Sequence, residues 1–281
     1  MSHRWACLIG QPVAHSHSPA LHNAAFAALG VDANYEAWDV PLDGLQKAVE
    51  ALRRADCMGA NVTAPHKQAV VQFVDEVSAE VVALGVMNTI VNRDGTLSGE
   101  NTDARGLARW MTQSGIDPSG QPALVLGAGG AARAAVWALA DLGASSILVL
   151  NRTRTRADGL VASLQPHLAG VELHSGDLKS AAEAHSEKPA WGVVINATSP
   201  GHHGAAPQVH PSCYSPQSVA IDLAYNPPET GFMVAARAAG ARAENGLGML
   251  LHQAALAFER WTGQTPPMDV YESAVKQRVA M

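Results

Sequence analysis

The sequence predicts an α/β protein of two domains. The chain has 281 residues, of which 47% are hydrophobic, and this is enough to build more than one core. Strand-like and helix-like segments alternate along it, which is typical of a sheet covered by helices. The alternation runs twice, with a break at the loop DPSGQ (117–121). We therefore expect one domain at 1–105 that is completed by 245–281, and a second domain at 106–244.

The first alternating series begins with WACLI (5–9), an apolar run that predicts a buried strand ending at Gly10. A helix is expected to start at Ser18-Pro19, with Ser18 as the N-cap and proline in the first turn. Gly30 is a natural stop for that helix. The rest of the series continues in the same way: a strand over 34–40, a helix over 42–55, a strand over 59–63 and a helix over 68–77.

A hairpin is expected at the end of the first series. The segments MNTIVN (87–92) and TLSGEN (96–101) flank Arg93-Asp94-Gly95, and an Asp-Gly pair favours a tight turn between two strands. Because a hairpin adds antiparallel strands to an otherwise alternating series, the sheet of the first domain should be mixed.

The second series follows a long predicted helix that begins near residue 104. Its expected segments are strands over 123–126, 146–150, 171–174, 192–198 and 218–225, and helices over 131–143 and 155–165. Residues 247–261 have apolar side chains at helical spacing, and we expect the C-terminal helices to return to the first domain.

Composition excludes several classes of protein. Charged residues make up 16% of the chain, the net charge is -6 and there is no long basic run, which argues against nucleic-acid binding. Cys7, Cys57 and Cys213 are far apart and form no CxxC pair, as expected of a cytoplasmic protein. The N-terminal segment predicts neither a signal peptide nor a membrane anchor. The HSH and HH pairs lack a third ligand at a recognisable spacing, so no metal site is expected.

The stretch ALVLGAGGAARAA predicts a Rossmann-type dinucleotide site. It places Gly127-x-Gly129-x-x-Ala132 between a strand and a helix. Gly127 permits the tight turn, Gly129 lets the backbone approach a pyrophosphate, and Ala132 permits close packing of the helix. The N-terminus of the helix supplies free N–H groups and a partial positive charge for phosphate.

The end of the following strand indicates which dinucleotide is preferred. NAD-binding units usually carry an acidic residue there, which binds the ribose hydroxyls. This chain has Asn151-Arg152-Thr153-Arg154-Thr155-Arg156 instead, with no carboxylate to repel a 2′-phosphate. The pattern favours NADP over NAD, with Arg152 and Arg156 as the preferred phosphate ligands and Arg154 as a solvated charge.

Three polar clusters of the first domain fall where predicted strands end: Ser16/Ser18, NVTAPHK (61–67), and NT (88–89) with ENTD (100–103). In open α/β sheets such strand ends line the ligand crevice. Lys67 with Asp103 is a plausible acid–base pair for a secondary alcohol, exchanging a proton with the carbinol oxygen as hydride moves to or from nicotinamide. From spacing alone, Lys67 is more often a surface lysine, and Asp103 is a good helix N-cap.

The motifs together resemble those of the shikimate dehydrogenase family. They occur in the order of that family along nearly the whole chain: GQPVAHSHSPALHN, NVTAPHK, GVMNTI, GENTDARG, GAGGAARA, NRT, NATSPG, DLAYNP and GLGMLLHQAALAFERWTGQTP. The resemblance implies reversible, NADPH-dependent reduction of 3-dehydroshikimate to shikimate in aromatic amino acid biosynthesis. It implies a monomer or a homodimer.

The resemblance also implies roles for individual residues. Lys67 and Asp103 would form the catalytic pair, and Ser16 and Ser18 would bind the substrate carboxylate. The other substrate-binding residues would be Asn61, Thr63, Asn88, Tyr225 and Gln253. The residues expected to bind NADP are Gly127, Ala128, Gly129, Gly130, Ala131, Asn151, Arg152, Thr153, Arg156, Thr198 and Gly246.

One departure from the family pattern concerns the nicotinamide. The family commonly has Gly-Met after Asn-Ala-Thr-Ser-x, whereas here Gly201 is followed by His202-His203, so we expect an altered cofactor contact. His66 has no implied role and is expected to be a surface or packing residue. Two alternatives stay open: a quinate or aminoshikimate dehydrogenase of the same fold, and a non-catalytic NADP-binding regulator. The intact Lys67 and Asp103 argue against the regulator.

Overall fold

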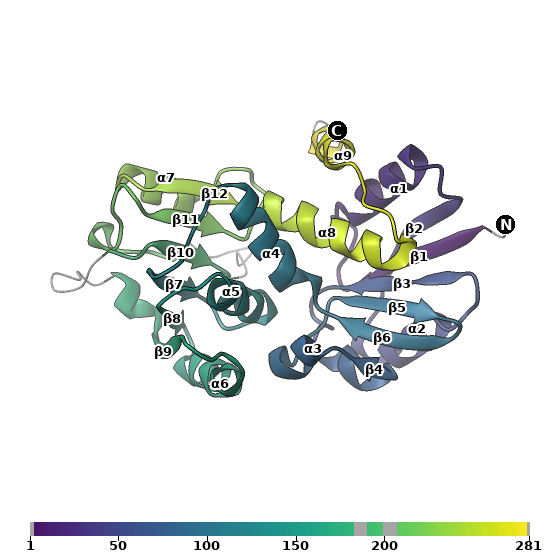
Figure 1. Ribbon diagram of the computed structural model, residues 1–281, viewed down its shortest axis with the longest axis horizontal. Helices are drawn as coiled ribbons and strands as arrows, with labels where there is room; N and C mark the ends of the chain where they lie inside the picture. Colours follow the sequence, from purple (N-terminus) through teal and green to yellow (C-terminus); the bar gives the residue numbers. More distant parts are fainter. Residues whose placement is uncertain (1–2, 183–189, 199–206, 280–281) are drawn as a thin grey trace. The chain divides into compact units, whose positions relative to one another are not determined.

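A computed structural model describes residues 3–182, 190–198 and 207–279 of the chain. It divides into two compact units: unit 1 comprises Met1–Gly106 and Leu251–Met281, and unit 2 comprises Leu107–Leu250. The chain passes from one unit to the other inside helix α4 (Thr102–Gln113) and back inside helix α8 (Leu247–Thr262) (Figure 1). Unit 1 is therefore discontinuous in sequence, whereas unit 2 is a single segment.

The sheet of unit 1 is mixed, as the hairpin predicted. Its strands lie in the order β2-β1-β3-β5-β6-β4, with β2-β1-β3 parallel, β3-β5-β6 antiparallel and β4 parallel to β6. Their bounds are β1 Arg4–Gly10, β2 Ala33–Asp39, β3 Cys57–Val62, β4 Glu76–Val77, β5 Thr89–Arg93 and β6 Thr96–Glu100.

The hairpin β5–β6 turns at Asp94-Gly95, where both residues have positive φ, 52° and 89°. This is the conformation that an Asp-Gly two-residue turn favours. Asn92 fixes the turn, because its Oδ1 accepts from the Gly95 N–H at 2.8 Å and its Nδ2 donates to carbonyls before β3, including that of Leu52 at 2.8 Å. The expected hairpin is confirmed.

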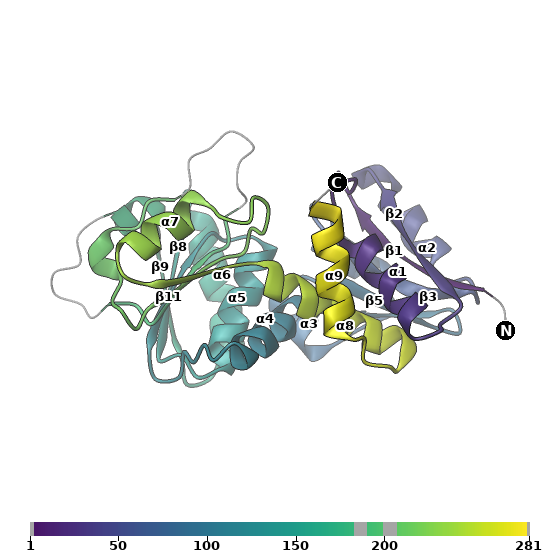
Figure 2. The same cartoon turned by 90° about the horizontal axis from the view of Figure 1, so that it is seen from above.

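The helices of unit 1 are α1 Ser18–Ala28, η1 Leu42–Gly44, α2 Leu45–Ala51, η2 Ala69–Phe73, α3 Ala79–Leu84, the second part of α8, and α9 Met268–Val279. Helix α9 packs along α1, so the C-terminal helices return to the first domain as expected (Figure 2). Large buried side chains of α1, α8 and α9, including Phe26, Phe258 and Tyr271, lie in the core of unit 1, where the rings of Phe26 and Phe258 pack with centroids 5.1 Å apart.

Two local predictions for unit 1 are wrong. Residues 68–77 do not form one helix: a short 3₁₀ helix is followed by the edge strand β4. The cause is tertiary, since the Asp75 carboxylate accepts from the Leu97 N–H and binds Arg53, which draws this segment alongside β6. Ser18 is also not the N-cap of α1. His17 occupies the cap position and the Ser18 N–H bonds to Ser16 Oγ at 3.2 Å.

Unit 2 is a doubly wound parallel sheet of the Rossmann type. Its strands lie in the order β12-β11-β10-β7-β8-β9, and all described pairings are parallel. In this order, the direction in which successive strands are added to the sheet reverses between the first and fourth strands, here β7 and β10. The bounds are β7 Pro122–Leu126, β8 Ser146–Asn151, β9 Glu172–Asp177, β10 Val193–Asn196, β11 Val219–Asp222 and β12 Arg242–Asn245.

The helices of unit 2 are α5 Gly130–Asp141, α6 Arg154–Leu164 and α7 Gly231–Ala238, with short 3₁₀ turns η3 Gln165–His167, η4 Leu178–Ala182 and η5 Pro211–Cys213. The sequence patterns did not predict α7, β12 or α9 individually. Within the described part of the chain, no helix has both the length and the apolar character that crossing a bilayer demands.

Candidate active site

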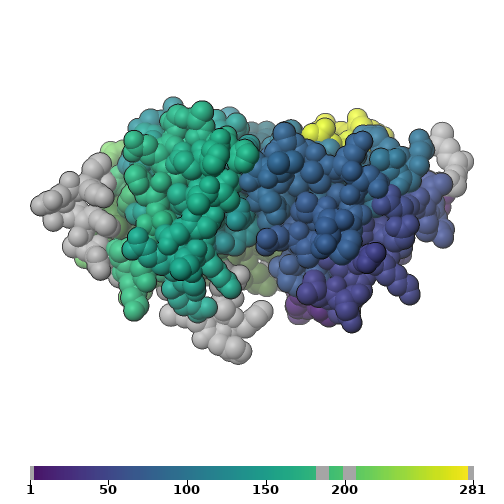
Figure 3. Space-filling view, turned by 90° about the horizontal axis from the view of Figure 1, so that it is seen from below, coloured from purple at the N-terminus to yellow at the C-terminus, as the bar shows by residue number. Residues whose placement is uncertain are grey.

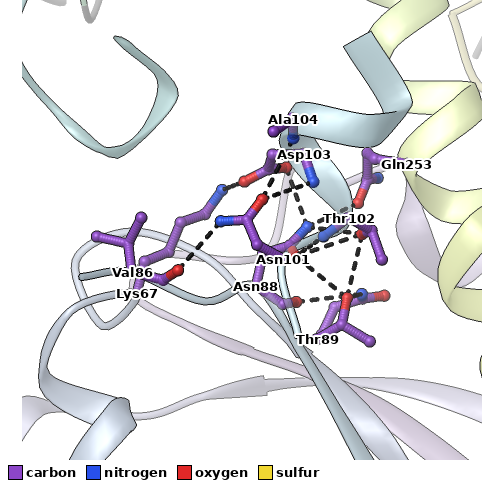
Figure 4. A network of polar contacts seen from close by, with 10 residues as sticks. Lys67, Val86, Asn88, Thr89, Asn101, Thr102, Asp103, Ala104 and Gln253 are labelled. Atoms are coloured by element: carbon purple, nitrogen blue, oxygen red, sulfur yellow. Dashed lines mark hydrogen bonds and ion pairs between the residues drawn. The ribbon is translucent and has the colours of Figure 1, made fainter. Parts of the chain in front are cut away.

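Lys67 and Asp103 form an ion pair in unit 1. Lys67 Nζ lies 2.5 Å from Asp103 Oδ2 (Figure 4). The side chain of Asp103 is 7% exposed and that of Lys67 is 23% exposed, so the carboxylate is buried and the lysine side chain is partly accessible. Charge-assisted hydrogen bonds of this kind are short and strong. The pair predicted from two distant motifs is thus assembled in one place.

The turn that carries Lys67 is anchored on both sides. His66 is fully buried, and its Nε2 lies 2.6 Å from the carbonyl oxygen of Val40. The carbonyl of Lys67 itself accepts from the Met87 N–H at 2.9 Å. His66 is therefore a buried anchor rather than a surface residue, and it holds the turn that directs Lys67 towards Asp103.

The Asp103 side chain is available for Lys67 because another residue caps α4. Asn101 Oδ1 accepts from the N–H groups of Asp103 at 3.0 Å and Ala104 at 3.2 Å, while its Nδ2 donates to Val86. The alternative of Asp103 as N-cap is thus wrong. The Asp103 carboxylate still lies in the first turn of the helix, where the helix dipole favours a negative charge.

Asn88 connects this pair to Gln253. Its Nδ2 lies 3.0 Å from Asp103 Oδ1, 2.9 Å from Thr102 Oγ1 and 3.2 Å from Gln253 Oε1. Its Oδ1 accepts from the Thr102 N–H at 2.7 Å. Asn88 is 2% exposed and is the centre of the network in Figure 4. Thr102, which lies in the polar cluster ENTD (100–103) but was assigned no role of its own, fixes the Asn88 carboxamide against α4.

Gln253 reaches the network because α4 and α8 approach closely at Gly106. A Cβ atom placed on Gly106 would lie 2.6 Å from the backbone nitrogen of Gln253. No side chain can occupy that space without moving one of the helices. Glycine at position 106 therefore brings Gln253, from the far end of the chain, next to Asn88.

A second group of polar contacts surrounds the predicted residue Asn61 on β3. Asn61 Oδ1 accepts from the Tyr35 hydroxyl at 2.8 Å, and its Nδ2 donates to Thr89 Oγ1 at 3.2 Å. Thr89 Oγ1 also lies 3.1 Å from Thr102 Oγ1, so the two groups form one network. Sequence analysis gave no role to Tyr35 or Thr89, although Thr89 lies in the polar cluster NT (88–89). The only sequence signal for Tyr35 was the alternation of NYEAWDV, in which its side chain falls on the face expected to point into the core.

The remaining unit 1 candidates lie beside this network. Ser16 Oγ donates to Ser18 Oγ at 3.2 Å, which places both hydroxyls together at the start of α1. Thr63 is half-buried just after β3, and its methyl group faces Gly10, where an added Cβ would lie 2.3 Å from it. The described side-chain hydrogen bonds do not connect Thr63 to Asn61.

The predicted pyrophosphate turn of unit 2 has the expected conformation. Gly127 follows β7 with φ of +111°, and an added Cβ would lie 2.9 Å from the Ala197 carbonyl oxygen, so only glycine fits. Gly129 precedes α5, and an added Cβ would meet nothing within 4 Å, which leaves the turn open to a ligand. Ala128, Gly130 and Ala131 complete the turn, with the first N–H groups of α5 beside them. These residues fit a bound pyrophosphate.

The arginine segment follows β8 and opens α6. Asn151 Nδ2 donates to the Thr153 carbonyl at 2.9 Å, and Thr153 is the N-cap residue of α6. Helix α6 contributes to the surface of unit 2 shown in Figure 3. Arg154 lies 3.7 Å from Asp158, whereas Arg152 and Arg156 are exposed and form no ion pair with any described residue. Two guanidinium groups are thus available for an anion.

The other unit 2 candidates follow successive strands. Thr198 comes after β10 and its hydroxyl donates to Asn196 Oδ1 at 2.6 Å. Tyr225 follows β11 and is half-buried. Gly246 follows β12, where an added Cβ would lie 2.1 Å from the Leu223 carbonyl oxygen. Such carboxyl ends form the ligand crevice of this sheet type. Gly201, His202 and His203 lie outside the described residues, and no cluster of potential metal ligands occurs in the ranges described.

Known protein families match nearly the whole chain. The shikimate dehydrogenase substrate binding domain matches residues 8–90, shikimate / quinate 5-dehydrogenase matches 110–225, and the shikimate 5′-dehydrogenase C-terminal domain matches 246–276. The shikimate dehydrogenase (NADP(+)) of Moorella thermoacetica is 42% identical over 274 residues, covering 96% of this chain and 92% of the relative. That of Geobacillus kaustophilus is 41% identical, covering 93% and 94%.

Solved structures agree with these matches. Shikimate 5-dehydrogenase from Thermus thermophilus, in complex with NADP(H) and shikimate, has a TM-score of 0.83 and 36% identity, covering 98% of this chain and 99% of that one. Quinate dehydrogenase from Corynebacterium glutamicum, in complex with NAD, has a TM-score of 0.85 and 30% identity over the same shares. The chain belongs to the shikimate dehydrogenase family.

Proposed function

We propose that this protein is an NADP-dependent shikimate dehydrogenase, which interconverts 3-dehydroshikimate and shikimate in aromatic amino acid biosynthesis. The observation that carries the proposal is the ion pair between Lys67 and Asp103, 2.5 Å apart inside a buried network of amide and hydroxyl groups. An intact acid–base pair in this setting favours an enzyme over a non-catalytic NADP-binding regulator.

The proposed chemistry uses Lys67 as the proton donor and acceptor. Bound NADPH would supply the hydride for the carbonyl carbon. Lys67 Nζ gives its proton to the carbonyl oxygen as negative charge develops there, and it takes the proton back from the hydroxyl in the reverse direction. Asp103 Oδ2 holds the lysine nitrogen in place, and Asn88 holds the other carboxylate oxygen at 3.0 Å.

The substrate would be held by polar residues of unit 1. Ser16 and Ser18 would bind the carboxylate of the substrate through their paired hydroxyls. The residues proposed to contact the ring and its hydroxyls are Asn61, Thr63, Asn88, Gln253 and Tyr225. The burial of Asn61, Asn88 and Gln253 supports this assignment, because their hydrogen bonds inside the protein fix the orientation of the polar groups that a substrate would meet.

The cofactor is held by unit 2. The turn from Gly127 to Ala131 would bind the pyrophosphate, and the exposed Arg152 and Arg156 would bind the 2′-phosphate with Asn151 and Thr153. Thr198 and Gly246 would lie near the nicotinamide half. The absence of an acidic residue after β8, together with two unpaired guanidinium groups in the described ranges, supports NADP over NAD. A monomer or homodimer remains our prediction for its assembly.

The test is a spectrophotometric assay of the purified protein with shikimate, quinate and aminoshikimate, each with NADP and with NAD. Shikimate with NADP should give a kcat/KM at least about tenfold above every other pair, a difference of about 1.4 kcal/mol in transition-state binding. A higher value with quinate or aminoshikimate would reassign the substrate. Absence of nicotinamide reduction with every pair would favour the regulator.

A further inference from the structure

The Asn61 carboxamide has both of its donors engaged inside the protein. Its Nδ2 lies 3.2 Å from Thr89 Oγ1 and 3.3 Å from the carbonyl oxygen of Asn88. A primary amide has two N–H donors and a carbonyl oxygen with two lone pairs. One lone pair accepts from the Tyr35 hydroxyl at 2.8 Å, so at most one acceptor position is left for a ligand.

The surrounding groups fix this orientation of the amide. If the amide were flipped, its oxygen would face the carbonyl oxygen of Asn88, which cannot donate and already accepts from the Val62 N–H at 2.8 Å. Two acceptor oxygens 3.3 Å apart in a buried place would repel each other, and this costs more than one hydrogen bond gains. Asn61 is 5% exposed, so water cannot easily satisfy the flipped form.

Tyr35 holds the amide from the other side. It is 3% exposed, and burial raises the pKa of its phenol well above the usual value, so the group keeps its hydrogen at neutral pH. A phenol has only one hydrogen, which here points at Asn61 Oδ1. Tyr35 thus fixes the acceptor side of the Asn61 amide.

His22 fixes the ring of Tyr35. It is fully buried and stacks on Tyr35 with ring centroids 4.4 Å apart and planes 24° apart. Its Nδ1 lies 3.3 Å from the Tyr271 hydroxyl of α9, and Trp261 packs against it with centroids 5.1 Å apart and planes 58° apart. Burial lowers the pKa of His22 to about 3, against a smaller opposing effect of Asn61, so the ring is neutral and places no charge beside the amide. Helix α9 therefore supports Tyr35 through His22.

We propose that Tyr35, supported by His22, is a positioning residue that presents Asn61 to the substrate only as a hydrogen-bond acceptor. The substrate group that meets Asn61 must then be a hydroxyl that donates, and a keto or ether oxygen in that position is rejected. This inference deepens the proposed function and rests on it, because it names the polarity with which one substrate hydroxyl is recognised.

The test compares Tyr35→Phe with the wild type. Removing the phenol releases the Asn61 amide, so the KM for shikimate should rise about 3- to 10-fold, the range of one neutral hydrogen bond. The value of kcat should stay within about twofold, and the KM for NADP should be unchanged, since Tyr35 is proposed to act on ground-state orientation of one substrate group. Tyr214→Phe, the same change in the core of unit 2, is the control and should alter neither KM.

A double variant separates positioning from general packing. If Tyr35 acts through Asn61, adding Tyr35→Phe to Asn61→Ala should raise the shikimate KM no further. Full additivity of the two substitutions would overturn the inference, as would a wild-type shikimate KM in Tyr35→Phe. Failure of the wild type to oxidise shikimate would instead refute the proposed function.

A neutron diffraction structure of the wild type with shikimate tests the same point without any variant. Deuterium atoms of the Asn61 amide directed at Thr89 and Asn88 would support the inference. Deuterium atoms of that amide directed at the substrate would overturn it.

Discussion

The candidate substrate region of unit 1 and the candidate nucleotide region of unit 2 consist of different kinds of chemical group. In unit 1, side chains bond to side chains, and Asn61, Asn88 and Asp103 are 5%, 2% and 5% exposed. In unit 2, the candidate ligand groups are the backbone of a glycine turn, the start of α5, and exposed guanidinium groups.

This difference follows from what each ligand needs. A small polar ring is recognised by the donor and acceptor positions of buried groups, where a wrong partner leaves a costly unsatisfied atom. A phosphate can be bound by backbone N–H groups and by cations that remain in water. Substitutions in unit 1 should therefore have large and non-additive effects on activity. Substitutions in unit 2 should have smaller effects, which depend on the salt concentration.

The largest expected effect is that of Lys67→Met, which keeps much of the side-chain length and removes the proton. Turnover should fall on the order of 10²–10⁴-fold, the usual contribution of a general acid–base group. Asp103→Asn should also lower turnover and weaken substrate binding, and the double variant should be less than additive because the two residues act together. Steady-state kinetics with calorimetric binding of shikimate measures both effects. Turnover near wild type in Lys67→Met would show that the lysine only binds.

The second-largest expected effect concerns the exposed arginines of unit 2. Arg152→Asp should lower kcat/KM for NADP about 10- to 100-fold, the equivalent of one charge-assisted phosphate contact, and leave NAD nearly unchanged. Arg154→Asp is the matched control and should have a much smaller effect, since Arg154 already neighbours Asp158. In the wild type, the KM for NADP should rise with ionic strength while that for shikimate rises less. Equal efficiency of the wild type with both cofactors would contradict the assignment.

The third effect concerns the helix crossing in unit 1. Gly106→Ala places a methyl group 2.6 Å from the Gln253 backbone, so it should destabilise the protein by about 1–3 kcal/mol and raise the shikimate KM. Gly159→Ala in α6 is the control: an added Cβ there meets nothing within 4 Å, and helix propensity should make the change neutral or stabilising by up to about 1 kcal/mol. Urea denaturation of both variants checks this. Equal stability of the two would mean that α4 and α8 can separate without cost.

The smallest effect is a pH dependence that comes from His22. Its pKa is lowered to about 3 in the folded protein, whereas an unfolded histidine has its pKa near 6.5. The unfolded state therefore binds the extra proton first, and stability is lost as pH falls below about 6.5. The groups that face His22, which are Tyr35 and Tyr271, stay neutral throughout this range because burial raises both pKa values.

Between pH 7.5 and pH 5.5 this linkage should cost about 1 kcal/mol of unfolding free energy. The His22→Gln variant lacks the titrating ring and should lose correspondingly less between the same two pH values. Urea denaturation of both proteins at both pH values measures the difference. Identical pH dependence would show that the folded protein accommodates a charged His22.

Much of the fold follows from local signals, and the parts that do not depend on contacts between distant residues. The Asp94-Gly95 turn and the Gly127 turn were predictable because each needs a backbone conformation that few residues adopt. The segment 68–77 was misread because its apolar spacing suits a helix, while Asp75 bonds to Leu97 and Arg53 and takes the chain into a strand.

The candidate site shows the same division. Lys67, Asp103, Asn88 and Gln253 were named from the family motifs, and the structure brings them together, although Asn88 and Gln253 are 165 residues apart. Tyr35 was not predicted, since it lies on β2 and reaches Asn61 on β3 across the intervening strand β1. Sequence spacing alone does not show which side chains meet across a sheet.

The double passage of the chain between the units has a consequence for biosynthesis. A ribosome makes all of unit 2 before it makes residues 251–281, which unit 1 needs. Until Gln253, Trp261 and Tyr271 emerge, Asn88 lacks one of its partners and His22 lacks two aromatic neighbours. A nascent or prematurely terminated chain can therefore complete its nucleotide-type sheet while its substrate-side network is still unassembled. The candidate nucleotide region and the candidate substrate region are therefore completed at different times during synthesis of the chain.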